Sequence, residues 1–199
     1  MSVAQDLFKW LEATDRVFHH EAAHVAAALA AGYKPTQVDL FSDYHFQVAA
    51  AMHHEQLEAE YYYTWPDADI TPESLATCAA EAERLAVLLL AGEAAEIALL
   101  ETDPDVARRG ALNDRAQAFA YLDRFLKADV LPAFARAEAA ARAFVERPGI
   151  AAFIRDLAFD FRLWLEAERP QRIKEQELAD LVRAAGGESI SGQGVAANG

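Results

Sequence analysis

Residues 20 to 24 read His-Glu-Ala-Ala-His, the spacing in this chain that is most informative about chemistry. On a helix, His20 and His24 project from one face, so both imidazoles can reach a single metal ion. Glu21 falls beside that face, where its carboxylate can reach a metal-bound water without becoming a ligand. Zinc hydrolases need this arrangement, because imidazoles hold the ion and a carboxylate accepts a proton from the water. The motif predicts zinc ligands at His20 and His24 and a general base at Glu21.

A catalytic zinc site also needs a third protein ligand and an open coordination position. The spacing alone does not choose among the remaining candidates, which are His45, His53, His54 and several Asp and Glu residues. The His53-His54 pair is better interpreted as an exposed polar segment, because adjacent side chains point in different directions. Two other interpretations stay open. Glu21-x-x-His24 is half of a di-iron carboxylate motif, although the chain has no second copy, and the histidines could lie on a polar helix face without metal.

The helix that carries this motif is predicted from about Asp15 to Ala31. Thr14 or Asp15 can cap its N-terminus, Gly32 suits the left-handed position after the last turn, and Pro35 prevents continuation. The next segment has a different composition. Residues 38–41 and 61–65 are rich in strand formers, so we predict a small β-element within residues 36–66.

Most of the remaining sequence favours helices. Thr71-Pro72-Glu73 is a strong helix start, with a capping hydroxyl and a proline in the first turn, and that helix should continue to Leu100 with a kink near Gly92. Residues 101–105 are predicted to form a loop and residues 113–127 a further helix. Three prolines divide the helical stretches that follow: Pro132, Pro148 and Pro170. We therefore expect one mainly α domain over residues 1–185 and a disordered tail over residues 186–199.

Composition excludes several classes of function. The formal net charge of -14 argues against a nucleic-acid partner, because phosphate backbones are bound mainly by clustered Lys and Arg. A single cysteine, Cys78, excludes an internal disulfide and fits a reducing compartment, and its small-residue surroundings indicate a buried inert thiol. We see no signal peptide, and the longest apolar runs are too short to cross a bilayer. These features lead us to expect a cytoplasmic protein.

Three blocks of sequence resemble the peptidase domain of FtsH-type membrane-bound AAA+ proteases. Residues 18–27, F-H-H-E-A-A-H-V-A-A, are similar to the H-E-A-G-H-A helix of that family. Residues 88–97, L-L-L-A-G-E-A-A-E-I, look like its L-L-G-G-R-x-A-E-E block. Residues 110–116, G-A-L-N-D-R-A, are close to its G-A-S-N-D-L-x-x-A block. The blocks occur in the order of the family and cover residues 18 to about 120.

The resemblance implies a helical, zincin-like metallopeptidase fold with one zinc ion per chain. It makes Asp114 the third zinc ligand, a role that a hard, anionic carboxylate can fill; a helix cap is the alternative role for this residue. It makes Glu96 and Asn113 candidates for the second shell, with a solvated helix charge as the alternative for Glu96. It also implies a substrate-binding edge strand, whose counterpart here is expected near three consecutive tyrosines, Tyr61, Tyr62 and Tyr63.

The sequence departs from the family at several points. Ala23 replaces a glycine within the metal motif, and Glu93 stands where the family has an arginine, so that any partner of this arginine is lost. The chain contains no phosphate-binding G-x-x-x-x-G-K-[ST] loop and none of the transmembrane segments of the family. The resemblance is therefore to a stand-alone peptidase domain.

Two functions follow as hypotheses. The first is a zinc metallopeptidase that cleaves unfolded or flexible polypeptides without ATP. The resemblance also suggests that the chain assembles into a homo-oligomer and that a separate ATPase or adaptor is its partner. The second is a catalytically silent, zinc-binding helical module that acts through protein–protein interaction.

Overall fold

The computed structural model describes residues 3–40, 72–170, 172–190 and 194. Most of these residues are helical, so the prediction of a mainly α fold is confirmed. The α-helices are α1 (Val3–Ala30), α3 (Pro72–Leu100), α4 (Pro104–Gly110), α5 (Leu112–Leu126), α6 (Val130–Val145), α7 (Pro148–Glu166) and α8 (Glu175–Ala184). The other elements are the strands β1 (Gln37–Asp39) and β2 (Arg172–Lys174) and the 3-10 helices η2 (Lys127–Asp129) and η3 (Gly187–Ser189).

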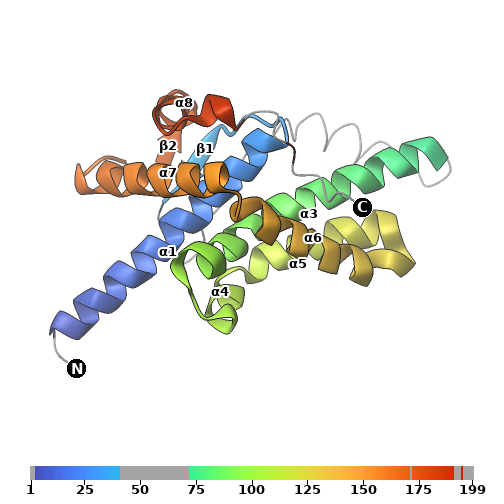
Figure 1. The fold of residues 1–199 in the computed structure, drawn as a ribbon, viewed down its shortest axis with the longest axis horizontal. Coiled ribbons are helices and arrows are strands. Elements are labelled where there is room, and N and C mark those ends of the chain that lie inside the picture. The colour runs from blue at the N-terminus through green and yellow to red at the C-terminus, as the bar shows by residue number, and fades with distance from the viewer. Residues whose placement is uncertain (1–2, 41–71, 171, 191–193, 195–199) are drawn as a thin grey trace.

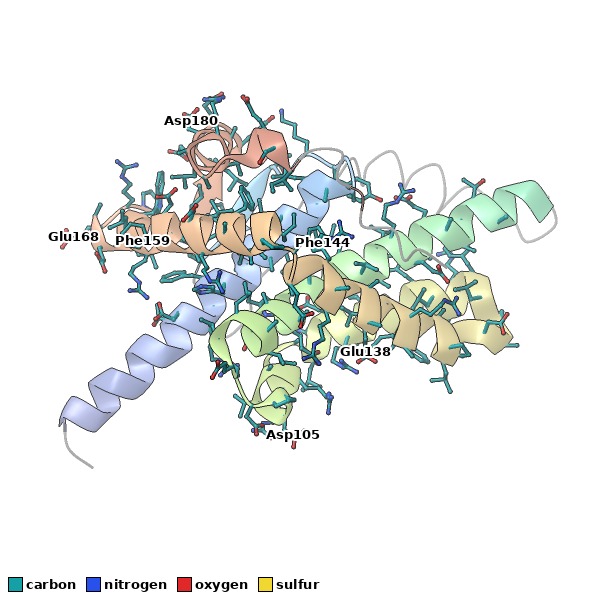
Figure 2. All side chains as sticks on the ribbon, in the orientation of Figure 1. Asp105, Glu138, Phe144, Phe159, Glu168 and Asp180 are labelled. Atoms are coloured by element: carbon teal, nitrogen blue, oxygen red, sulfur yellow. The ribbon has the colours of Figure 1, made fainter. Side chains whose placement is uncertain are left out.

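Two long helices, α1 and α3, form the centre of the fold (Figure 1). Helix α3 packs against α1, α5 and α6, while α1 also packs against α7. The contact faces of α1 and α3 are rich in buried alanines, among them Ala22, Ala23, Ala26 and Ala91. Small side chains let the two backbones approach closely, and this brings the metal motif on α1 next to the middle of α3. Larger side chains such as Phe144 on α6 (Figure 2) complete the core.

Helix α1 begins at Val3, so the predicted start at Asp15 is wrong and Thr14 lies inside the helix rather than at its cap. The residues before Thr14 include no Gly or Pro and are mostly good helix formers, so nothing stops the helix there. The predicted end is confirmed. Gly32 has φ +85°, its N–H donates to Leu29 O at 3.0 Å, and the Tyr33 N–H donates to Ala28 O at 2.9 Å. This pair of hydrogen bonds is a Schellman motif.

The strand expected after α1 is present as β1, but its partner comes from the far end of the chain. β1 pairs with β2 in antiparallel register, with Val38 opposite Ile173, and both side chains are fully buried. Strand β2 follows Pro170 and is only three residues long, which is too short for a periodicity signal. The other predicted strand, residues 61–65, lies outside the described residues.

Two helices after residue 70 begin at predicted prolines, whereas Pro132 lies in the first turn of α6 and Pro170 precedes β2. Helix α3 begins at Pro72 and continues through Gly92 to Leu100 as one helix, and α7 begins at Pro148. The predicted loop over residues 101–105 is too long, because α4 already begins at Pro104. The Asp103 carboxylate caps this short helix by accepting hydrogen bonds from the N–H groups of Asp105 (2.9 Å) and Val106 (3.2 Å).

The chain continues to pack on the helical domain beyond residue 185. Gly187–Ser189 form η3, and the Ile190 side chain is buried in the core. Gly187 is required for this packing, because a Cβ at this position would lie 2.3 Å from Val182 Cγ1. The segment is rich in Gly and Ser, so its composition did not indicate that the Ile190 side chain is buried. Within the described part of the chain, no helix is both long and apolar enough to cross a membrane.

Candidate metal centre

Both histidines of the metal motif are buried in α1 and held through their Nδ1 atoms by α3. His20 Nδ1 lies 2.8 Å from Glu96 Oε1, and His24 Nδ1 lies 2.9 Å from the backbone oxygen of Leu88. A carboxylate and a carbonyl can only accept hydrogen bonds, so each Nδ1 is the donor. These contacts fix the orientation of both rings and direct both Nε2 atoms toward α5.

Asp114, in the first turn of α5, faces both of these Nε2 atoms with a single oxygen. Its Oδ2 lies 3.1 Å from His20 Nε2 and 3.6 Å from His24 Nε2. One ligand atom from each of the three residues lies within 4.8 Å of the others. In a tetrahedral site with metal–ligand bonds of about 2.0–2.1 Å, ligand atoms are about 3.3 Å apart. The donor chemistry suits a metal ion, and the spacing makes a metal site between α1 and α5 geometrically possible.

Glu96 links His20 to the guanidinium group of Arg16. Its Oε1 accepts from His20, and its Oε2 accepts from Arg16 Nε at 2.7 Å. Glu96 is buried, so it occupies the place of an outer carboxylate behind a ligand histidine rather than that of a solvated charge. Asn113 differs, because it is exposed on the first turn of α5. The structure does not bring Asn113 into the second shell.

The centre strongly favours positive charge. Burial opposes protonation of His20, but hydrogen bonds with Asp114 and Glu96 and the nearby charge of Glu21 outweigh it and raise the pKa of His20 to about 10. For Asp114, desolvation is outweighed by His20 and His24, which lower the pKa of its carboxyl far below the ordinary range. Carboxylates surround the imidazoles on several sides, so a proton or a metal cation is stabilised there.

Gly92 explains how the His20 ring fits against α3. A Cβ at Gly92 would lie 2.4 Å from His20 Nε2, 2.5 Å from Cδ2 and 2.6 Å from Cε1. The imidazole therefore lies directly on the backbone of α3, where no side chain can be accommodated. A glycine inside a helix costs about 1 kcal/mol relative to alanine, and here the close approach of the ring requires it.

Glu93, which stands where the similar family has an arginine, forms an ion pair with Arg115. Arg115 NH1 donates to Glu93 Oε1 at 3.1 Å and to Oε2 at 2.9 Å. Glu93 is buried, and Arg108 Nε lies 3.9 Å from its Oε1. The chain therefore has a partly buried ion pair between α3 and α5, next to the candidate metal centre.

The remaining predicted residues divide into two groups. Glu21 is buried in α1 beside the candidate ligands, with 1% of its surface exposed, and Cys78 is a buried free cysteine. The other group lies outside the described residues: His45, His53, His54, Tyr61, Tyr62 and Tyr63. The structure therefore places the candidate metal ligands and the candidate base, whereas the expected substrate strand lies outside the described residues.

Sequence reasoning missed two residues near His20: Arg16, which binds Glu96, and Gly92, against which the ring lies. Arg16 lies one helical turn before His20 on the same face of α1, and this i, i+4 spacing is a signal that could have found it. Gly92 had a weaker signal, a glycine within a helical pattern, which we interpreted as a kink rather than as a close approach. The Leu88 carbonyl is a backbone group, so no residue type could have indicated its role.

Comparison with known proteins adds no assignment. No family model, no curated protein and no solved structure matches this chain. The argument for function therefore depends on the geometry of the centre and on the sequence resemblance.

Proposed function

We propose that this chain is a zinc-dependent peptidase domain, with His20, His24 and Asp114 as the protein ligands. The observation that supports it best is that two Nε2 atoms from α1 converge on one carboxylate oxygen from α5, at 3.1 and 3.6 Å. Two imidazoles and one carboxylate leave a fourth tetrahedral position open, as catalytic zinc sites require. The bound ion would supply Lewis acidity and lower the pKa of a water molecule.

The side chains of the protein would then have separate roles. Glu21 accepts a proton from the attacking water on its carboxylate and returns it to the leaving amine. Glu96 and the Leu88 carbonyl keep the Nδ1 atoms of the two histidines protonated, which leaves the Nε2 lone pairs available. Arg16 balances the charge of Glu96 and fixes its orientation. Together these contacts hold the ligands in place before substrate arrives.

The proposed substrates are unfolded chains, flexible tails and peptides. The sequence contains no phosphate-binding loop with which this chain could drive unfolding by ATP hydrolysis. Partners suggested by the resemblance, a second copy of the chain and a separate ATPase or adaptor, belong to the same proposal.

The decisive test compares Glu21→Gln with the wild type. Zinc content is measured by elemental analysis of protein purified without added metal, and cleavage is measured on an unstructured casein-like substrate with and without chelator. We expect one zinc per chain in both proteins and a loss of cleavage of about a hundredfold or more in E21Q. The matched control is Glu166→Gln, an exposed residue at the end of α7, which should leave cleavage unchanged. Equal cleavage by E21Q and the wild type contradicts the mechanism.

One observation favours the alternative, a catalytically silent zinc-binding module. Only 1% of the surface of Glu21 is exposed, whereas a general base must reach the water that it deprotonates and the leaving amine. A zinc-loaded wild type that turns over no unfolded substrate, with or without added ATPase, would favour this alternative. A protein that holds no zinc would contradict both functions.

A further inference from the structure

A partly buried ion pair ties α3 to α5 beside the proposed ligand set. Glu93 follows Gly92, against which the His20 ring lies, and Arg115 follows Asp114. Arg115 NH1 reaches both oxygens of Glu93, at 2.9 and 3.1 Å. Both members of the pair are therefore adjacent in sequence to a residue that builds the centre.

Arg115 is fixed from a second helix as well. Figure 2 labels Glu138 on α6. Arg115 NH1 lies 2.8 Å from Glu138 Oε1, and the guanidinium carbon of Arg115 lies 5.1 Å from the centroid of the Phe134 ring, also on α6. A guanidinium held by carboxylates and an aromatic face has little freedom to move. The backbone of α5 at Arg115 is consequently held between α3 and α6.

Helix α3 acts as the common support for all three proposed ligands. It holds His20 through Glu96 and His24 through the Leu88 carbonyl. Asp114 comes from a different helix, α5, and 23% of its side chain is exposed. The Glu93–Arg115 pair is the charged contact that fixes α5 on α3 at the level of Asp114.

We propose that Glu93 and Arg115 are positioning residues that place the Asp114 carboxylate opposite the two imidazoles. This inference rests on the proposed function, because it concerns the affinity of the site for zinc. It goes further by assigning a role to an ion pair that touches none of the proposed ligands through its side chains. Without the pair, α5 can shift relative to α3. Asp114 Oδ2 is then no longer held at 3.1 Å from His20 Nε2 and 3.6 Å from His24 Nε2.

The test uses Arg115→Met, which removes the guanidinium and keeps an unbranched apolar stem. Arg108→Met is the matched control, because Arg108 also approaches Glu93 but comes from α4 and is not adjacent to a proposed ligand. The affinity for Zn²⁺ is measured by competition with a chromophoric chelator. The visible spectrum of the Co²⁺-loaded protein reports the ligand geometry, and unfolding in excess chelator reports stability without metal.

Partners that hydrogen-bond metal ligands directly contribute roughly tenfold to a hundredfold in affinity, so a pair that acts through the backbone of α5 should contribute about tenfold. We expect R115M to weaken zinc binding by that factor and to change the Co²⁺ spectrum, while R108M leaves both unchanged and Arg115→Lys restores part of the affinity. If R115M does not fold without metal, the isosteric variant Glu93→Gln takes its place, with weaker zinc binding and an altered Co²⁺ spectrum expected.

The outcomes separate this inference from the proposed function. Tight zinc binding by the wild type and equal binding by R115M, or by E93Q in its place, overturns the inference and leaves the proposed function intact. Equal weakening in R115M and R108M also overturns it, because the effect would then be one of general stability. A wild type that binds no zinc overturns both.

Discussion

Replacing Gly92 with alanine would test the packing of the proposed site directly. The new Cβ would lie 2.4 Å from His20 Nε2, whereas ordinary van der Waals contact begins near 3.4 Å. The ring must therefore retreat by about 1 Å, or the two helices must separate. Glu96 and Asp114 hold the ring at 2.8 and 3.1 Å, so it cannot move without loss of these contacts.

The expected magnitude combines two opposed effects. Overpacking a buried site costs about 1–3 kcal/mol, whereas alanine in a helix interior is about 1 kcal/mol better than glycine. The metal-free variant should therefore lose about 0–2 kcal/mol of unfolding free energy. Metal–ligand distances tolerate only about 0.2 Å, so a shift of about 1 Å in the ring should weaken zinc binding at least about tenfold, or roughly 1.4 kcal/mol.

A matched control is available within the chain. Gly149 is also helical, in the first turn of α7, and a Cβ there would meet nothing within 4 Å. Gly149→Ala should raise stability by about 0.5 kcal/mol and leave zinc affinity unchanged. Both quantities are measured by urea unfolding in excess chelator and by competition for Zn²⁺. A G92A protein that gains stability as G149A does and binds zinc as tightly as the wild type would refute the reasoning.

Four further outcomes are expected. In excess chelator, the unfolding free energy should fall between about pH 6.5 and 10. The pKa of His20 is raised to about 10 in the folded state, so protonated His20 stabilises the fold fully below about pH 6.5, its pKa in the unfolded chain, and this stabilisation is lost as pH rises through about 10. The pKa of the Asp114 carboxyl is lowered, so ionised Asp114 stabilises the fold above about pH 4, and this stabilisation is lost at lower pH. Urea unfolding of Asp114→Asn at a series of pH values should show that the unfolding free energy changes less at both acidic and alkaline pH. Gly32→Ala should lower the unfolding free energy by about 1 kcal/mol, because φ is +85° there, and a denaturant titration measures this loss. Asp103→Ala should cost about 1 kcal/mol through loss of the α4 cap, visible as a lower thermal midpoint in circular dichroism.

Local signals in the sequence predicted much of the helical fold. Pro72 and Pro148 mark helix starts, and Gly32 marks a helix end, because each residue restricts the backbone in a way that depends little on distant contacts. The start of α1 was mispredicted since Thr14 is a good cap only when the preceding residues leave the helix. Strand β2 could not be predicted, because three residues take strand form only through pairing with β1.

The candidate centre divides in the same way. His20, Glu21 and His24 follow from one motif on one helix, so helical geometry alone predicts their proximity. Asp114 is 94 residues from His20 in sequence, and the resemblance, not the spacing, indicated it. The Glu93–Arg115 pair could not be predicted, because it forms only when α3 and α5 pack together and nothing in the local sequence of either residue indicates the other. Zinc and catalysis themselves stay predictions.

The ladder between β1 and β2 has a consequence for the order in which the chain can fold. Lys34 and Glu175, which form an ion pair beside it, are 141 residues apart in sequence. During synthesis from the N-terminus, Val38 in β1 therefore cannot be buried against Ile173 until the chain has been made through β2. Contacts between such distant segments form late, because the entropy of closing the intervening loop must be overcome first. A nascent chain that stops before residue 172 would leave an open strand edge available for pairing with other chains.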